Sequence, residues 1–198
     1  MPALTFATLK TELSDRGFDQ LSDTRLGYFI NQARGELDGM HNWPYRLATA
    51  TGSSPLTITD LGSIEEVADT NQTGAPALDY ADRRSLKQAY GDLTVAGAPA
   101  FFYVDNGVVR TYPVGGSLSV RYYKRAPDLS GTQVPLAPSD YHLLIVDMAV
   151  RWAQKDGEQP DSVSGDIQRQ LAIMVTDLFG QQIVGSDLVP VAGESCDW

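Results

Sequence analysis

Residues 22–40, SDTRLGYFINQARGELDGM, predict an amphipathic helix around which the rest of the chain can be arranged. Ser22 is a strong N-cap, because its hydroxyl can accept a bond from a backbone N–H of the first turn. Apolar residues then follow at helical spacing along one stripe, and polar side chains lie largely off it. The stripe consists of Leu26, Phe29, Ile30, Ala33, Leu37 and Met40, and the polar residues are Arg25, Asn31, Gln32, Arg34, Glu36 and Asp38. Trp43-Pro44 ends the helix, since a residue before proline disfavours helical backbone.

Three further segments each carry a single apolar stripe. Thr5 is expected to cap the first of them, and Gly17 offers the left-handed residue that stops it. We expect Ser139 to cap the third helix of the chain, and Ser162 or a residue near it to begin the fourth. The stripes are Phe6, Leu9 and Leu13; Tyr141, Leu144, Ile145, Met148 and Trp152; and Val163, Ile167, Leu171, Met174 and Leu178. One-sided helices bury their stripes best against each other, so the sequence predicts a four-helix bundle.

The chain between the two helix pairs has the composition of strands and turns. Asp105-Asn106-Gly107 predicts a tight hairpin, because asparagine and glycine tolerate positive φ. Strands are predicted at residues 46–51 and 56–59 on either side of a turn at 52–55, at 63–68, 101–104, 108–112 and 117–124, and a short helix capped by Asp82 is predicted at 83–90. Because the last three strands follow each other closely, we expect residues 101–125 to form a three-stranded meander.

The predicted fold class is α+β, with a four-helix bundle made of two N-terminal and two C-terminal helices. The bundle comprises residues 1–44 plus 126–185, and a β-rich insert of residues 45–125 separates its second and third helices. Residues 186–198 contain Pro190 and Gly193 and few helix formers, so we expect an extended C-terminal tail.

The composition is that of a globular protein without metal or disulfide dependence. The 198 residues include 15 Lys and Arg, 25 Asp and Glu, and one cysteine, Cys196, with a formal net charge of −10. A protein that grips nucleic acid normally has a basic face, so the acidic balance argues against that function. No apolar run approaches the roughly 20 residues that a membrane span needs. We also expect no signal peptide, because no basic patch followed by an apolar core opens the sequence.

Catalytic and metal-binding patterns are missing. His41 and His142 have no second histidine or cysteine at ligand spacing, and no glycine-rich phosphate loop or nucleophile elbow is present. Cys196 lies near Glu194 and Asp197, and neighbouring negative charge raises the pKa of a thiol, which argues against a nucleophile. We therefore expect no catalytic residues, no cofactor and no metal.

Several short motifs occur in a particular order along the chain. They are LTFATLK at residues 4–10, GF at 17–18, LSDTRL at 21–26, NQARGEL at 31–37 leading to Trp43-Pro44, the strands from Phe101 to Tyr123, and VPL at 134–136 followed by YHLLIVD at 141–147. In this order they resemble the head-tail connector, or adaptor, proteins of long-tailed bacteriophages. The resemblance covers roughly residues 4–180.

The resemblance implies a structural virion protein without enzymatic activity. Such adaptors form a ring, typically of twelve subunits, that docks on the portal protein, contacts the next neck or tail protein and leaves a central channel for DNA. The chain would be made in the host cytoplasm and reside in the virion neck. An acidic ring suits DNA that passes without sequence-specific binding, because negative charge repels phosphate.

Two groups of residues are candidates for partner binding. The tail residues Leu188, Val189, Val191 and Trp198 are apolar side chains that we expect to dock on the portal or on a neighbouring subunit. The second group is Asp105, Asn106 and Gly107, at the tip of the predicted hairpin, which we expect to reach the next neck protein or an adjacent subunit.

Three other functions are compatible with the sequence. Another neck or tail-completion ring, a stopper or a terminator, is the nearest, and such rings are usually dominated by β structure. A small hydrolase with a scattered site would need converging titratable groups in a pocket. A DNA-binding module that uses residues 22–40 as a recognition helix would show salt-dependent affinity for duplex DNA.

Overall fold

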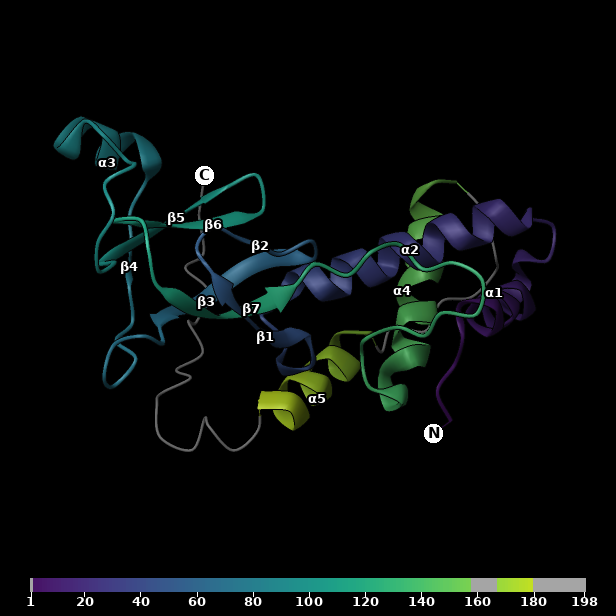
Figure 1. The fold of residues 1–198 in the computed structure, drawn as a ribbon. Helices are drawn as coiled ribbons and strands as arrows, with labels where there is room; N and C mark the ends of the chain where they lie inside the picture. Colours follow the sequence, from purple (N-terminus) through teal and green to yellow (C-terminus); the bar gives the residue numbers. More distant parts are fainter. Residues whose placement is uncertain (1, 158–166, 180–198) are drawn as a thin grey trace, which may run out of the picture.

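The computed structural model describes residues 2–157 and 167–179 of the chain, which form a mixed α+β fold (Figure 1). An N-terminal helix pair packs against α4, and two β-sheets are inserted between α2 and α4. The helices are α1 (Phe6–Leu13), α2 (Asp23–Met40), α3 (Arg83–Tyr90), α4 (His142–Lys155) and α5 (Ile167–Phe179). In Figure 1, α1, α2 and α4 lie at one end of the molecule, and the strands and α3 extend away from them.

The predicted helix signals act as expected at the start of the chain. The Thr5 hydroxyl accepts the N–H of Thr8 at 3.2 Å, and the Ser22 hydroxyl accepts the N–H of Arg25 at 3.3 Å. Gly17 stops the first helical segment with φ 96°, a conformation that costs glycine little.

The helices α1, α2, α4 and α5 share one core, as their stripes predict. Fully buried members of this core include Leu9, Leu13, Phe29, Ile30, Leu37, Leu144, Ile145, Met148 and Met174.

Three details of the helix predictions are wrong. Met40 is 36% exposed, whereas Arg34 and Asp38, predicted to lie off the apolar stripe, are only 4% and 7% exposed. The loop that returns from the sheets covers that second face of α2. Two hydrogen bonds between the Asn31 side-chain amide and the Leu129 backbone, at 3.1 and 2.8 Å, hold the loop there. Ser139 does not cap α4. It begins a 3₁₀ turn, and α4 starts three residues later. The predicted start of the last helix, near residue 162, lies outside the described residues.

The insert contains two sheets that share one apolar core. The strands are β1 (Leu47–Ser53), β2 (Leu56–Thr57), β3 (Leu61–Asp69), β4 (Asp79–Tyr80), β5 (Phe101–Asp105), β6 (Val108–Tyr112) and β7 (Ser117–Lys124). One sheet has the order β1-β7-β3 and the other has the order β2-β6-β5-β4. Leu118 and Val120 of the first sheet pack in the same cluster as Phe102 and Val109 of the second. The sheets therefore bury apolar side chains against each other as layers of one core.

The predicted meander is wrong, because β7 leaves its neighbours in sequence and pairs with β1 and β3. Gly115 and Gly116, at φ 156° and 85°, carry the chain from one sheet to the other. This crossing lets Leu118 and Val120 face the second sheet, so they become fully buried. The predicted turn at residues 52–55 is also displaced, since Gly52 and Ser53 continue β1, and β1 and β2 belong to different sheets.

The insert begins and ends at the same place. Leu47, the first residue of β1, lies opposite Tyr123 near the end of β7. The Arg46 guanidinium reinforces this root, because its Nε donates to the Lys124 carbonyl at 2.8 Å and its Nη1 donates to the Asp38 carbonyl of α2. The chain therefore leaves the helical part and returns to it at one place, where the two strands pair and Arg46 hydrogen-bonds to both sides.

Candidate interaction sites

His142 is a structural residue. It is 1% exposed, its Nδ1 accepts the Leu4 backbone N–H at 2.9 Å, and its Nε2 donates to the Ala137 carbonyl at 2.8 Å. Because Nδ1 accepts, the ring proton resides on Nε2, and neither nitrogen is left to act on a substrate. The ring joins the N-terminal segment, the loop before α4 and the first turn of α4.

The second histidine and the acidic side chains do not converge on a reactive centre within residues 2–157 and 167–179. His41 is exposed and meets Trp43 edge to face, with ring centroids 4.9 Å apart. Asp82 caps α3 as predicted, accepting the N–H groups of Arg84 and Ser85 at 2.9 and 3.2 Å. In this part of the chain no group of three or more His, Cys, Asp or Glu side chains could hold a metal ion. Cys196 lies outside the described residues.

A buried polar cluster lies where α2 meets the insert. The Tyr45 hydroxyl donates to Asp38 Oδ1 at 2.9 Å, and Arg34 Nη1 lies 3.6 Å from Asp38 Oδ2. Burial raises the pKa of the Asp38 carboxyl above its usual value, although the Tyr45 bond and the nearby Arg34 and Arg46 charges oppose the shift. Burial also raises the pKa of Tyr45, and the Asp38 carboxylate beside it adds to the effect.

This cluster fixes the root of the insert rather than supplying chemistry. The Asp38 carboxyl and the Tyr45 hydroxyl hydrogen-bond to each other, and the Arg46 side chain donates to backbone carbonyls of α2 and β7. The sequence pattern did not reveal this cluster, because Arg34 and Asp38 are predicted to lie off the apolar stripe. Their i, i+4 spacing was the available signal, since such a pair lies side by side on a helix.

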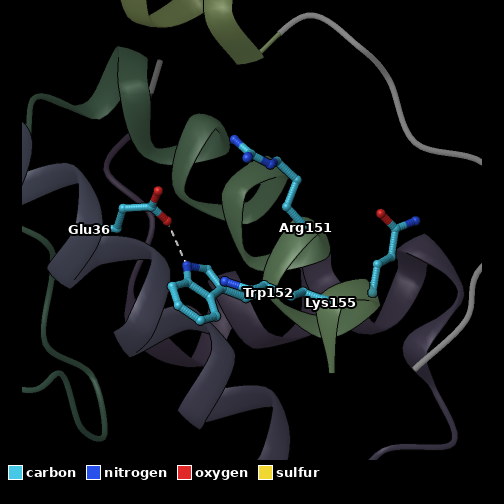
Figure 2. Close-up of a pocket in the computed structure, with 5 residues that line it drawn as sticks. Glu36, Arg151, Trp152 and Lys155 are labelled. Atoms are coloured by element: carbon cyan, nitrogen blue, oxygen red, sulfur yellow. Dashed lines mark hydrogen bonds between the residues drawn. The ribbon is translucent and has the colours of Figure 1, made fainter. Parts of the chain in front are cut away.

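A shallow pocket of about 320 Å³ opens on the face that α2 and α4 share (Figure 2). Trp152 Nε1 donates to Glu36 Oε2 at 2.7 Å across the two helices, and Lys155 Nζ lies 4.9 Å from the centre of the indole ring. Arg151 and Gln154 complete the lining. A half-buried tryptophan framed by charged groups is typical of a protein contact surface.

The predicted hairpin tip is present at the end of β5 and β6. Asn106 and Gly107 have φ values of 52° and 77°, as a tight hairpin requires. Asp105 pairs with Arg83 of α3 at 2.9 Å, and the Ile58 N–H donates to the Gly107 carbonyl at 3.1 Å. The three predicted residues therefore lie together, but contacts from α3 and from the segment after β2 brace the tip.

A groove of about 570 Å³ runs between the edge strand β3 and the strands β4 and β5. Val67, Leu78 and Phe102 line it with apolar groups, and Glu65, Glu66 and Asp79 supply carboxylates. Tyr80 is 67% exposed and Val104 is 38% exposed beside it. Exposed apolar side chains around a groove are typical of a contact surface, and the sequence pattern did not reveal this one.

The predicted tail residues Leu188, Val189, Val191 and Trp198 lie outside the described residues. Within the described residues, no helix is both long and apolar enough to cross a membrane.

Comparison with known proteins identifies a matching family. The family model described as SU10 adaptor protein matches residues 4–187, which include every described helix and strand. No curated protein matches the chain.

Proposed function

Because the chain belongs to the SU10 adaptor protein family, a family of phage head-tail adaptors, we propose that it forms a ring that docks on the portal and links it to the neck and tail. The family match over residues 4–187 carries this proposal. The matched residues contain both the helical core and the insert, so the family match applies to every described helix and strand.

Two exposed surfaces of the fold support the ring proposal. A closed ring repeats one heterologous interface, so each subunit must have two different contact faces. The α2–α4 face around Trp152 and the groove beside Tyr80 and Val104 are candidates for these faces, and they lie on different parts of the fold. We propose that they contact adjacent copies of the chain, in a ring of twelve, and the next neck or tail protein.

We propose that DNA passes through the ring without sequence-specific binding. The formal net charge of −10 per chain supports this, because negative charge repels phosphate groups and gives them few places to bind. We also propose that the chain has no catalytic role and needs no cofactor. The engagement of both His142 nitrogens by backbone groups supports this part of the proposal.

The direct test is electron microscopy of the full chain bound to phage heads that carry the portal. We expect a ring at the portal vertex whose symmetry, counted from the images, is twelve. An absence of density at that vertex would contradict the docking proposal, and a different symmetry would contradict the copy number alone.

Removal of residues 186–198 should weaken binding to portal-bearing heads about tenfold or more. Buried tryptophan and aliphatic anchors commonly supply much of the binding energy of an interface. Co-sedimentation with purified heads measures the effect. The matched control replaces the same residues with a glycine-serine segment of equal length. Equal binding by all three forms would rule out the tail as a docking element.

Replacement of both Asp105 and Asn106 by glycine should stop heads from joining tails while the helical core stays folded. We propose that the insert of residues 45–125 is an attachment arm on the bundle of residues 1–44 and 126–185. Glycine keeps the turn, because it adopts positive φ easily, but it removes both side chains from the tip. The readouts are circular dichroism and the yield of joined particles. Arg83→Ala is the control, since it breaks the ion pair with Asp105 and leaves the tip residues in place. A normal yield from the glycine variant would contradict the role of the tip.

A further inference from the structure

A second pocket, of about 290 Å³, lies where α2, the end of β7 and the loop after β7 meet. Its lining combines cations with apolar side chains. The lining includes Arg34, Lys124, Arg125, Leu129, Val134 and Leu136.

The Arg34 charge in this pocket is only partly compensated. Nη2 lies 3.3 Å from Asp128 Oδ1, on a side chain that is 84% exposed, and Nη1 is 3.6 Å from Asp38 Oδ2, beyond hydrogen-bond distance. Nε and Nη1 have no hydrogen-bond acceptor, although the residue is 4% exposed. A buried guanidinium with idle donors favours an additional carboxylate nearby.

Two more cations line the pocket. The exposed side chain of Arg125 makes no hydrogen bond or ion pair with any described residue, and Lys124 Nζ reaches only Asp60 Oδ2, at 4.0 Å. Asp60 is the one carboxylate among the lining residues, and Asp38 and Asp128 contact Arg34 from beside the pocket. The pocket lining is therefore cationic in a chain whose net charge is −10.

Other lining side chains form an apolar wall that is incompletely covered. Leu129 is buried, but Val134 and Leu136 are each 43% exposed. A ligand that fits both walls must carry a carboxylate and, close to it, an apolar side chain, because each wall otherwise stays in water.

We propose that this pocket binds the C-terminal segment of the same chain, residues 186–198. The segment has the required composition, since Asp187, Glu194 and Asp197 are interspersed with Leu188, Val189, Val191 and Trp198. A carboxylate of the segment pairs with the exposed Arg125, where the nearby Arg34 charge also favours it, and an aliphatic or indole side chain covers Val134 and Leu136. The segment is held in this way before it meets a portal.

The end of α5 lies close enough for this contact. Phe179 packs on Trp43 with ring centroids 5.6 Å apart, and Trp43 stacks on Tyr45 at 6.0 Å. Tyr45 bonds Asp38, whose carboxylate lies beside Arg34. An extended chain advances about 3.3 Å per residue, so the residues between Phe179 and residue 186 can span more than about 20 Å. Tethering raises the local concentration of the segment to roughly the millimolar range, so binding within one chain is favoured over binding between chains.

The test uses Cys196, the one cysteine of the chain, as a reporter in the full-length protein. Val134→Cys places a second thiol on the apolar wall of the pocket. Val95→Cys is the matched control, because Val95 is 47% exposed but belongs to the insert. At low protein concentration under mild oxidation, we expect the disulfide between residues 134 and 196 to form within one chain, about tenfold faster than the control disulfide. Peptide mass spectrometry and non-reducing electrophoresis identify the linked residues and separate intrachain from interchain products.

Charge reversal tests the electrostatic half of the proposal. Arg125→Glu in the Val134→Cys background should slow disulfide formation several-fold, whereas Arg84→Glu, the same change on an exposed residue of α3, should leave the rate unchanged. Equal rates for Val134→Cys and Val95→Cys would overturn the proposal. Disulfide-linked dimers would assign the pocket to a second copy and would overturn it too, as would an Arg125→Glu variant that cross-links at the original rate. None of these results bears on ring formation at the portal.

Discussion

Replacement of Trp43 by alanine is expected to lower the free energy of unfolding by about 3–5 kcal/mol. The side chain is fully buried at the end of α2, and its Nε1 donates to the Leu37 carbonyl at 2.6 Å. Its ring also contacts Tyr45 at the root of the insert and Phe179 at the end of α5. The substitution therefore leaves a cavity where three parts of the fold meet.

Urea denaturation followed by circular dichroism measures this loss. Trp43→Phe should lower the free energy of unfolding less than Trp43→Ala, because phenylalanine keeps an aromatic ring in the cavity. It still loses the hydrogen bond to the Leu37 carbonyl, so it should be less stable than the wild-type protein. The surface control, Val95→Ala, should change the unfolding free energy by less than about 0.5 kcal/mol. A Trp43→Ala protein as stable as that control would show that Trp43 does not hold the three parts together.

Replacement of His142 by leucine is expected to lower the free energy of unfolding by about 2–4 kcal/mol. The substitution keeps an apolar side chain of similar size but removes the partners of the Leu4 N–H and the Ala137 carbonyl. A buried polar group left without a partner costs roughly 1–3 kcal/mol. The N-terminal segment should also detach from the loop before α4, so proteolysis near residue 4 should become faster.

Two variants of His142 separate the two bonds. Asparagine can replace Nδ1 as the acceptor for Leu4, and glutamine can replace Nε2 as the donor to Ala137, so each should recover part of the loss. His41→Leu is the control, because His41 is exposed. If leucine at position 142 were as stable as the wild-type protein, the two hydrogen bonds would contribute nothing measurable.

Local sequence signals predicted the elements of this fold well. The caps Thr5, Ser22 and Asp82 act at their own backbone N–H groups, so no knowledge of distant residues is needed to identify them. The stripes of α1, α2, α4 and α5 predicted a shared core, and Asn106-Gly107 predicted the hairpin.

Strand partners could not be predicted in the same way. The alternation of Leu118, Val120 and Tyr122 predicts a strand with one buried face, but it contains no information on which strand lies beside it. Proximity in sequence predicts pairing with β6, whereas β7 pairs with β1 and β3, and the two sheets bury apolar side chains against each other as layers. Pairings of this kind depend on the whole insert, not on a window of residues.

The contact surfaces were the least predictable part. The Trp152–Glu36 bond joins residues 116 positions apart, and the groove near Tyr80 exists only once β3 and β4 are in place. Of the predicted partner-binding residues, Asp105, Asn106 and Gly107 lie together at the hairpin tip, and their partner remains a proposal.

The common entry and exit point of the insert has an evolutionary consequence. Since Leu47 and Tyr123 are ladder partners, the gap that the insert must bridge is the width of one strand pair, whatever is built beyond it. Loops, hairpins or whole modules can thus be gained, lost or exchanged between related phages at this position without any change in the spacing of α2 and α4. An engineer could graft a foreign domain at the same two residues and expect the helices to fold as before.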